Sequence, residues 1–250
     1  MVEPTQLPNA PITEALLDIQ VKLPAGTDLA KLATFHQGLK QRYPSKQERV
    51  SWRGSIEIKA KPVAHLSQSA EGGPDGYLFT AVDGRQVVQT RLDGFTFSRL
   101  KPYENWETLR DEARELWQHY VRIASPEAVT RIALRYINRI EIPLPMRDFK
   151  DYILTTPEIA PDLPQRLESF FMRLVIPDPQ SQAVTIVTET MEPIGESSDR
   201  LPWILDIDVF RVAVFNPQDQ AMWESFEHLR ILKNDIFFKS ITPKAKELFQ

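Results

Sequence analysis

The sequence contains no cysteine, and this absence excludes disulfide bonds, thiolate nucleophiles and zinc sites built from cysteine. It has only nine glycines, and they form no glycine-rich phosphate-binding loop. No stretch reaches the ~18 consecutive apolar residues of a membrane span. The first residues lack the basic region and the apolar run of a signal peptide. We therefore expect a cytoplasmic protein that does not associate with a membrane.

The chain also lacks an excess of basic charge, because its 250 residues carry a formal net charge of -4. Nucleic-acid binding is therefore not expected, since it needs a strongly basic surface. The four histidines are far apart and match no metal-ligand spacing, and no serine stands in a nucleophile elbow. Without a catalytic motif, the sequence favours a binding protein without a cofactor over an enzyme.

The order of apolar patterns predicts an α+β fold made of two similar halves. Residues 15–23 alternate between apolar and polar side chains as in a half-buried strand, and residues 106–123 carry an apolar stripe at helical spacing. Each half is predicted to hold a strand, a helix, three or four antiparallel strands and a closing helix.

We place the boundaries of this prediction as follows. The halves are residues 12–127 and 128–250, they share one core, and residues 1–11 form an extended lead-in. Residues 65–76 are rich in serine, glycine and acidic side chains, which is typical of a loop. Asn216 is followed by a proline, so we expect it to be the N-cap of the closing helix of the second half.

The strand predicted over residues 131–142 carries arginines on one face only. Alternate side chains of a strand point to opposite faces, so Arg131, Arg135 and Arg139 share one face while mostly apolar residues occupy the other. Three like charges on one strand face repel each other unless an anionic ligand, carboxylates or water lie beside them. The pattern therefore indicates either a site or a ladder of ion pairs.

Arginines on two further predicted strands could extend this face. If the strand faces converge, the guanidinium groups would form a cradle for a small anionic ligand or for a partner protein, because they bind phosphate and carboxylate groups in a bidentate manner. The alternative is an ion-pair ladder with carboxylates such as Asp93 and Glu141. We predict a non-catalytic binding or assembly protein, possible as a homodimer, that binds its partner through the arginine face. The residues of this predicted site are Arg91, Arg99, Arg131, Arg135 and Arg139.

A second hypothesis, a metal-dependent phosphohydrolase, starts from carboxylates. Asp206 and Asp208 share one strand face, and Glu189 lies on the preceding strand. Clustered carboxylates can hold Mg²⁺, and with the arginines they would form a site like that of enzymes that hydrolyse triphosphates. Those enzymes carry alternating glutamates and a lysine on the first strand, and this chain departs from that pattern. The alternative is that the aspartates pair with the arginines.

Three segments of the chain resemble a known bacterial family. They are residues 9–17 (NAPITEALL), residues 88–106 (VQTRLDGFTFSRLKPYENW) and residues 131–143 (RIALRYINRIEIP). Together they are similar to a sporadically distributed family of conserved hypothetical proteins of this length, whose function is unknown. The resemblance implies a bacterial, cytoplasmic protein, and a patchy distribution suits an accessory or defence-linked gene. It implies no catalytic residue.

Overall fold

The structure is a computed structural model that describes residues 7–59, 65–195 and 198–250, and the side chains of residues 51–59 and 65–71 lie outside the description. Its helical segments are α1 (Leu29–Ala33), the 3-10 turn η1 (Thr34–Gly38), α2 (Trp106–Ala124), the 3-10 turn η2 (Phe149–Asp151), α3 (Gln220–Ser240) and α4 (Pro243–Glu247). The described strands are β1 (Ile12–Lys22), β2 (Ser45–Lys59), β3 (His65–Thr80), β4 (Gln86–Arg91), β5 (Gly94–Leu100), β6 (Ala128–Pro143), β7 (Phe171–Asp178), β8 (Ala183–Met191) and β9 (Arg200–Phe215).

The described strands form one sheet of nine strands in the order β2-β3-β4-β5-β1-β6-β9-β8-β7. Every pair of neighbours is antiparallel. β1 and β6 pair at the junction, with Leu17 opposite Leu134. The strands of residues 12–127 lie on one side of this junction and those of residues 128–250 on the other. The prediction of an α+β fold with an antiparallel sheet is therefore confirmed.

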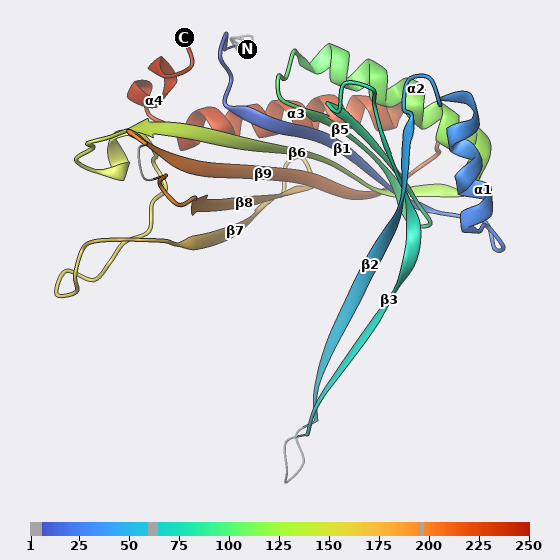
Figure 1. Cartoon of the computed structure of the whole chain (residues 1–250), viewed down its shortest axis with the longest axis horizontal. Coiled ribbons are helices and arrows are strands. Elements are labelled where there is room, and N and C mark those ends of the chain that lie inside the picture. The colour runs from blue at the N-terminus through green and yellow to red at the C-terminus, as the bar shows by residue number, and fades with distance from the viewer. Residues whose placement is uncertain (1–6, 60–64, 196–197) are drawn as a thin grey trace.

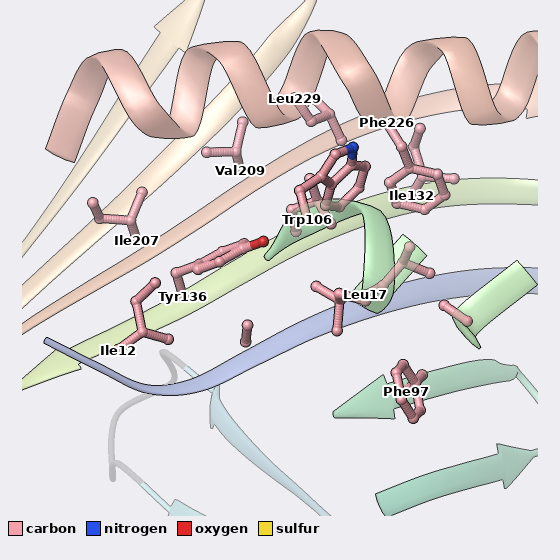
Figure 2. Packing of buried hydrophobic residues seen from close by; sticks show 14 of the residues in the cluster. Ile12, Leu17, Phe97, Trp106, Ile132, Tyr136, Ile207, Val209, Phe226 and Leu229 are labelled. Atoms are coloured by element: carbon pink, nitrogen blue, oxygen red, sulfur yellow. The ribbon is translucent and has the colours of Figure 1, made fainter. Parts of the chain in front are cut away.

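Both long helices cover the same face of the sheet (Figure 1). α2 packs on β1 and β5, and α3 packs on β6 and β9. Leu17 of β1 and Ile132 of β6 are fully buried on this side, and Figure 2 shows them with Phe226 and Leu229 of α3. In the part of the chain that the structure describes, no helix is both long enough and apolar enough to cross a membrane.

The opposite face of the sheet carries the charged side chains. Residues directly opposite each other in antiparallel strands point to the same face. The register therefore gathers side chains from β1, β6 and β9, three strands that are adjacent in the sheet. We call this side the polar face; its central residues are Asp18, Arg131, Arg135, Asp206 and Asp208.

The two halves share a pattern of strand order. The last strand of each half pairs with its first strand, since β5 pairs with β1 and β9 pairs with β6. A long helix follows each of these last strands. The similarity of the halves stays a prediction, because a shared order of elements does not measure how well they superpose.

Two predicted boundaries are wrong. Residues 65–76 belong to β3, which pairs with β2 in a long hairpin that extends away from the body of the sheet (Figure 1). The last long helix begins at Gln220, with Asp219 as its N-cap. Asn216 instead accepts a hydrogen bond from the backbone of Gln218, because asparagine before proline favours a turn as well as a helix start.

Candidate functional site

Arg131 lies within a chain of charges that crosses the polar face. Its Nη1 is 3.2 Å from Oδ2 of Asp18 on β1, and its Nη2 is 3.6 Å from Oδ2 of Asp208 on β9. Its guanidinium group also lies 4.4 Å from the ring centre of Phe210. The charges on these neighbouring strands therefore alternate in sign and hold each other in place.

Arg91 continues this chain from the end of β4. Its Nη2 is 2.9 Å from Oδ1 of Asp18, and its Nε is 2.8 Å from Oδ1 of Asp93. Its Nη1 donates a hydrogen bond to the hydroxyl of Thr96. Arg91 is only 7% exposed. All three nitrogen atoms of its guanidinium group therefore have partners within the protein.

Arg135 forms a bidentate ion pair with Asp206. Its Nε is 2.9 Å from Oδ1 and its Nη2 is 2.6 Å from Oδ2 of the carboxylate, which is the strong geometry for this pair. The hydrogen bonds with Asp206 raise the pKa of Arg135. Burial raises the pKa of the neighbouring Asp208, against the opposite effect of Arg131 and Arg135. Both aspartates of the metal hypothesis therefore pair with arginines.

The two remaining arginines of the predicted site lie apart from this chain of charges. Arg139 near the end of β6 pairs with Glu141 and with Glu192, whose Oε2 is 2.9 Å from its Nε. Arg99 lies on the helix-covered face because of the register between β1 and β5, and it pairs there with Glu104. The structure therefore brings four of the five predicted arginines to the polar face: Arg91, Arg131, Arg135 and Arg139.

Carboxylates outnumber guanidinium groups around these four arginines. Each of the four has a carboxylate partner among the described residues, and an added anion would meet an excess of negative charge. The geometry therefore matches the ion-pair ladder, the alternative to an anion cradle. The six partner carboxylates are Asp18, Asp93, Glu141, Glu192, Asp206 and Asp208.

The third carboxylate of the metal hypothesis points away from the other two. Glu189 is opposite Leu205 and Asp206 is opposite Thr188, so Glu189 points to the helix-covered face. It is 1% exposed there, its Oε2 accepts a hydrogen bond from Nε1 of Trp203 at 2.9 Å, and burial raises the pKa of Glu189 to about 7. Among the described residues, no three carboxylates or histidines converge on a point where they could hold a metal ion. These residues therefore do not fit Mg²⁺.

Replacing Arg135 with alanine is expected to lower the free energy of unfolding by about 1.5–3 kcal/mol, the usual range for a hydrogen bond to a charged group. The change leaves the carboxylate of Asp206, a residue that is only 8% exposed, without its bidentate partner. The cost stays below that of a fully buried pair, because the Arg135 side chain is 43% exposed and water screens it. Urea denaturation at pH 7 measures the change.

Asp206→Asn and the double variant complete a thermodynamic cycle for this pair. A favourable coupling energy of about 1 kcal/mol or more is expected between Arg135 and Asp206. Unchanged stability of Arg135→Ala would contradict the ladder. It would favour a ligand-binding role for the polar face.

A cavity of about 1000 Å³ lies on the helix-covered face, between the start of α2, α3, β6 and the segment before β1. Aromatic and aliphatic residues form part of its wall, and Figure 2 shows Tyr136 between Ile12 and Trp106, which all line it, although the surface that the cavity exposes is more polar than apolar. Two cationic side chains of α3, Arg230 and Lys233, also line it. Two carboxylates, Glu104 and Glu107, line it as well, so the cavity combines aromatic side chains with charges of both signs.

Lys233 is buried in the wall of this cavity. The residue is 8% exposed, and its Nζ lies 3.7 Å from the ring centre of Tyr136. No carboxylate of the described residues forms a salt bridge with it, and no other lysine of that part of the chain is buried. Burial and then the charge of Arg230 lower the pKa of Lys233 to about 7. A lysine in this state is typical of functional sites.

Arg230 supplies a second, more exposed cation. Its contacts with Glu107 and Glu227 are long, at 3.8 Å and 3.6 Å. Glu227 is also bound by Nε1 of Trp106 at 2.8 Å and by Nη1 of Arg110 at 2.9 Å. The carboxylate of Glu227 is therefore shared among several donors, and Arg230 retains capacity to bind a ligand.

Two tyrosines complete the wall of the cavity. The hydroxyl oxygens of Tyr103 and Tyr136 are 3.1 Å apart, and their rings meet edge to face. Burial raises the pKa of Tyr103 to about 12 and the pKa of Tyr136 well above its usual value, so both hydroxyls stay protonated at neutral pH. Their mutual hydrogen bond uses one of the two hydroxyl hydrogens. The other is available to an oxygen atom of a ligand.

The sequence prediction missed this cavity, although Lys233 leaves a signal. It occupies the apolar stripe of α3, four residues after Leu229 and four before Phe237, and both of these neighbours are buried. A lysine in such a stripe must either extend its side chain to the surface or be buried at a high cost. This position therefore marks a candidate functional residue that a search for arginines and carboxylates overlooks.

No family model, curated protein or solved structure matches this chain. The resemblance to the bacterial family therefore stays a prediction. Function has to be argued from the geometry and charge of the site.

Proposed function

We propose that this chain is a binding protein for a small organic anion, which it holds in the cavity beside Lys233. The sequence predicts anion binding by the arginine face, but the arginines of the polar face have carboxylates of their own. The observation that carries the proposal is a buried ammonium group in a cavity wall, without a carboxylate partner among the described residues. Such a charge is costly unless a ligand supplies its counter-charge.

The cavity also indicates the class of ligand. Its size is at the upper end of the roughly 300–1000 Å³ that small-molecule pockets have, and its wall combines aromatic side chains with polar and charged groups. Lys233 and Arg230 suit a carboxylate or phosphate group, while Trp106, Tyr136 and Phe237 suit an apolar body. The proposed ligand is therefore a carboxylate or a phosphate monoester that carries an aromatic or aliphatic group.

Isothermal titration calorimetry at pH 6.5 tests this proposal with phenyl phosphate, p-toluate and octanoate, and with benzyl alcohol as the uncharged comparison. At least one anion is expected to bind, and Lys233→Met is expected to weaken it by about tenfold to a hundredfold, the range for a lost charged hydrogen bond. Lys239→Met is the matched control, because Lys239 lies on the same helix with its side chain 74% exposed.

Two results would contradict the proposal. One is that benzyl alcohol binds as tightly as the anions, because the cations would then contribute nothing. The other is that Lys233→Met and wild type bind the anion equally well.

The other predictions have less support from the geometry. No described arrangement favours the metal-dependent phosphohydrolase, and a partner protein or a homodimer contact on the polar face stays a prediction.

We infer that the two halves are similar units, and the matching order of β1, β5 and α2 with β6, β9 and α3 supports this. An experimental structure in which residues 12–124 and 130–240 fail to superpose would contradict the inference.

A further inference from the structure

We propose that the side-chain amine of Lys233 forms an imine with an aldehyde or a ketone that enters the cavity. This inference rests on the proposed function. It adds that the organic anion held in the cavity carries a carbonyl group. The reacting compound would thus be an organic anion with an aldehyde or keto group on its apolar body.

Burial distinguishes Lys233 from the other lysines whose side chains the structure describes. Lys22, Lys150, Lys239 and Lys244 each form a salt bridge with a carboxylate and have side chains that are at least 53% exposed. Lys233 has no such partner among the described residues, and its Nζ lies over the ring of Tyr136 in the cavity wall. Within the described part of the chain, no anionic side chain therefore holds its amine.

The charges around Lys233 favour the neutral amine, the form that attacks a carbonyl carbon. Arg230 on the same helix disfavours a second positive charge, and burial acts in the same direction. Beside Lys233, Tyr136 of β6 and its hydrogen-bond partner Tyr103 stay protonated at neutral pH. Glu104 and Glu107 are the carboxylates that line the cavity, and they bind Arg99 and Arg230 respectively. A desolvated lysine beside another cation is an established way to make a nucleophilic amine.

The reaction needs no oxidant, reductant or metal. The lone pair of Nζ attacks the carbonyl carbon, a C–N bond forms, and the electron pair of the C=O π bond moves to oxygen. The two hydrogens of the neutral amine end on this oxygen by proton transfer, and the C–O bond breaks to release water as the nitrogen lone pair expels it. This lone pair becomes the π bond of the C=N group in the same step. The free hydroxyl hydrogen of the tyrosine pair can stabilise the charge that develops on the oxygen.

The test uses 4-carboxybenzaldehyde, an aromatic aldehyde with a carboxylate, together with p-toluate, its counterpart without a carbonyl group. The full-length protein is incubated with one equivalent of the aldehyde at pH 7.5 and reduced with borohydride. Peptide mapping by mass spectrometry then locates the secondary amine. We expect labelling of Lys233 at least about tenfold above Lys239, because only the neutral fraction of a lysine reacts.

Variants separate this proposal from the proposed function. Lys233→Met is expected to lose the label while keeping its helix content by circular dichroism, and Lys239→Met is expected to keep the label on Lys233. If p-toluate binds but Lys233 is not labelled, the imine proposal fails and anion binding stands. If Lys233 is labelled but p-toluate, phenyl phosphate and octanoate all fail to bind, anion binding fails and only the reaction of Lys233 with a carbonyl group stands. Equal labelling of exposed lysines and Lys233 overturns the imine proposal.

Discussion

Trp117→Ala is expected to lower the free energy of unfolding by about 3–5 kcal/mol through loss of core packing. Trp117 of α2 is 1% exposed. Its ring stacks on Tyr120 with centres 5.4 Å apart and meets the edge of Phe95 on β5 at 5.8 Å. Alanine would leave a cavity among large side chains on a sheet and a helix, and such interiors close only partly around a lost group.

The same tryptophan also ties α2 to the second half of the chain. Its Nε1 donates a hydrogen bond to the carbonyl oxygen of Pro217, 2.9 Å away in the segment before α3. Trp117→Phe keeps much of the ring and loses this bond, so it is expected to cost about 1–2 kcal/mol. The difference between the two variants separates lost volume from the lost hydrogen bond.

Guanidinium chloride denaturation followed by far-ultraviolet circular dichroism measures both effects. Val212→Ala is the control, because Val212 is 71% exposed and its truncation is expected to change stability by less than about 0.5 kcal/mol. A loss below about 1 kcal/mol for Trp117→Ala would contradict its role in the core. Two separate transitions in wild type would show that the halves unfold independently, against the prediction of one shared core.

Features of the fold that depend on nearby residues could be predicted from the sequence. Asn105 caps α2, and its Oδ1 accepts a hydrogen bond of 2.7 Å from the backbone N–H of Thr108. The helix ends before Ser125, which adopts the left-handed conformation with φ of 51° ahead of a proline. These signals are local, because a cap and its partner lie within one turn of each other.

Features of the candidate site depend on strand register, which the sequence does not show. The arginine face of β6 could be predicted by alternation alone, but the partner of Arg135 lies 71 residues further along the chain. Glu189 shows how strongly the face of a side chain depends on register. A shift of one residue in the pairing of two strands moves a side chain to the other face of the sheet. From the sequence, the ion pairs of the polar face could therefore be predicted only as one of two possibilities, the other being a site for an anionic ligand.

Lys233→Met is expected to raise the free energy of unfolding at pH 6 by about 3–5 kcal/mol. Folding lowers the pKa of Lys233 from 10.5 to about 7, so between these values the unfolded chain holds a proton that the folded chain has released. The stability of wild type therefore rises with pH across this window, by at most about 1.4 kcal/mol per pH unit, and is lowest below pH 7. Methionine is apolar and of similar length. The variant therefore lacks the free-energy cost of burying a charged amine, and it lacks the change of stability with pH that this amine causes.

The measurement is urea denaturation of wild type and Lys233→Met in parallel from pH 6 to pH 10. The other groups that line the cavity, among them Arg230 of α3 and Tyr136 of β6, are common to both proteins, so the difference between the two curves isolates Lys233. Lys239→Met is expected to follow the wild-type curve, because its side chain is 74% exposed. A constant difference across the whole range would mean that Lys233 has an ordinary pKa in the folded protein. The argument for an uncompensated charge in the cavity would then fail, whereas a difference that closes toward pH 10 would show that burial penalises the charged form of Lys233 in the folded protein.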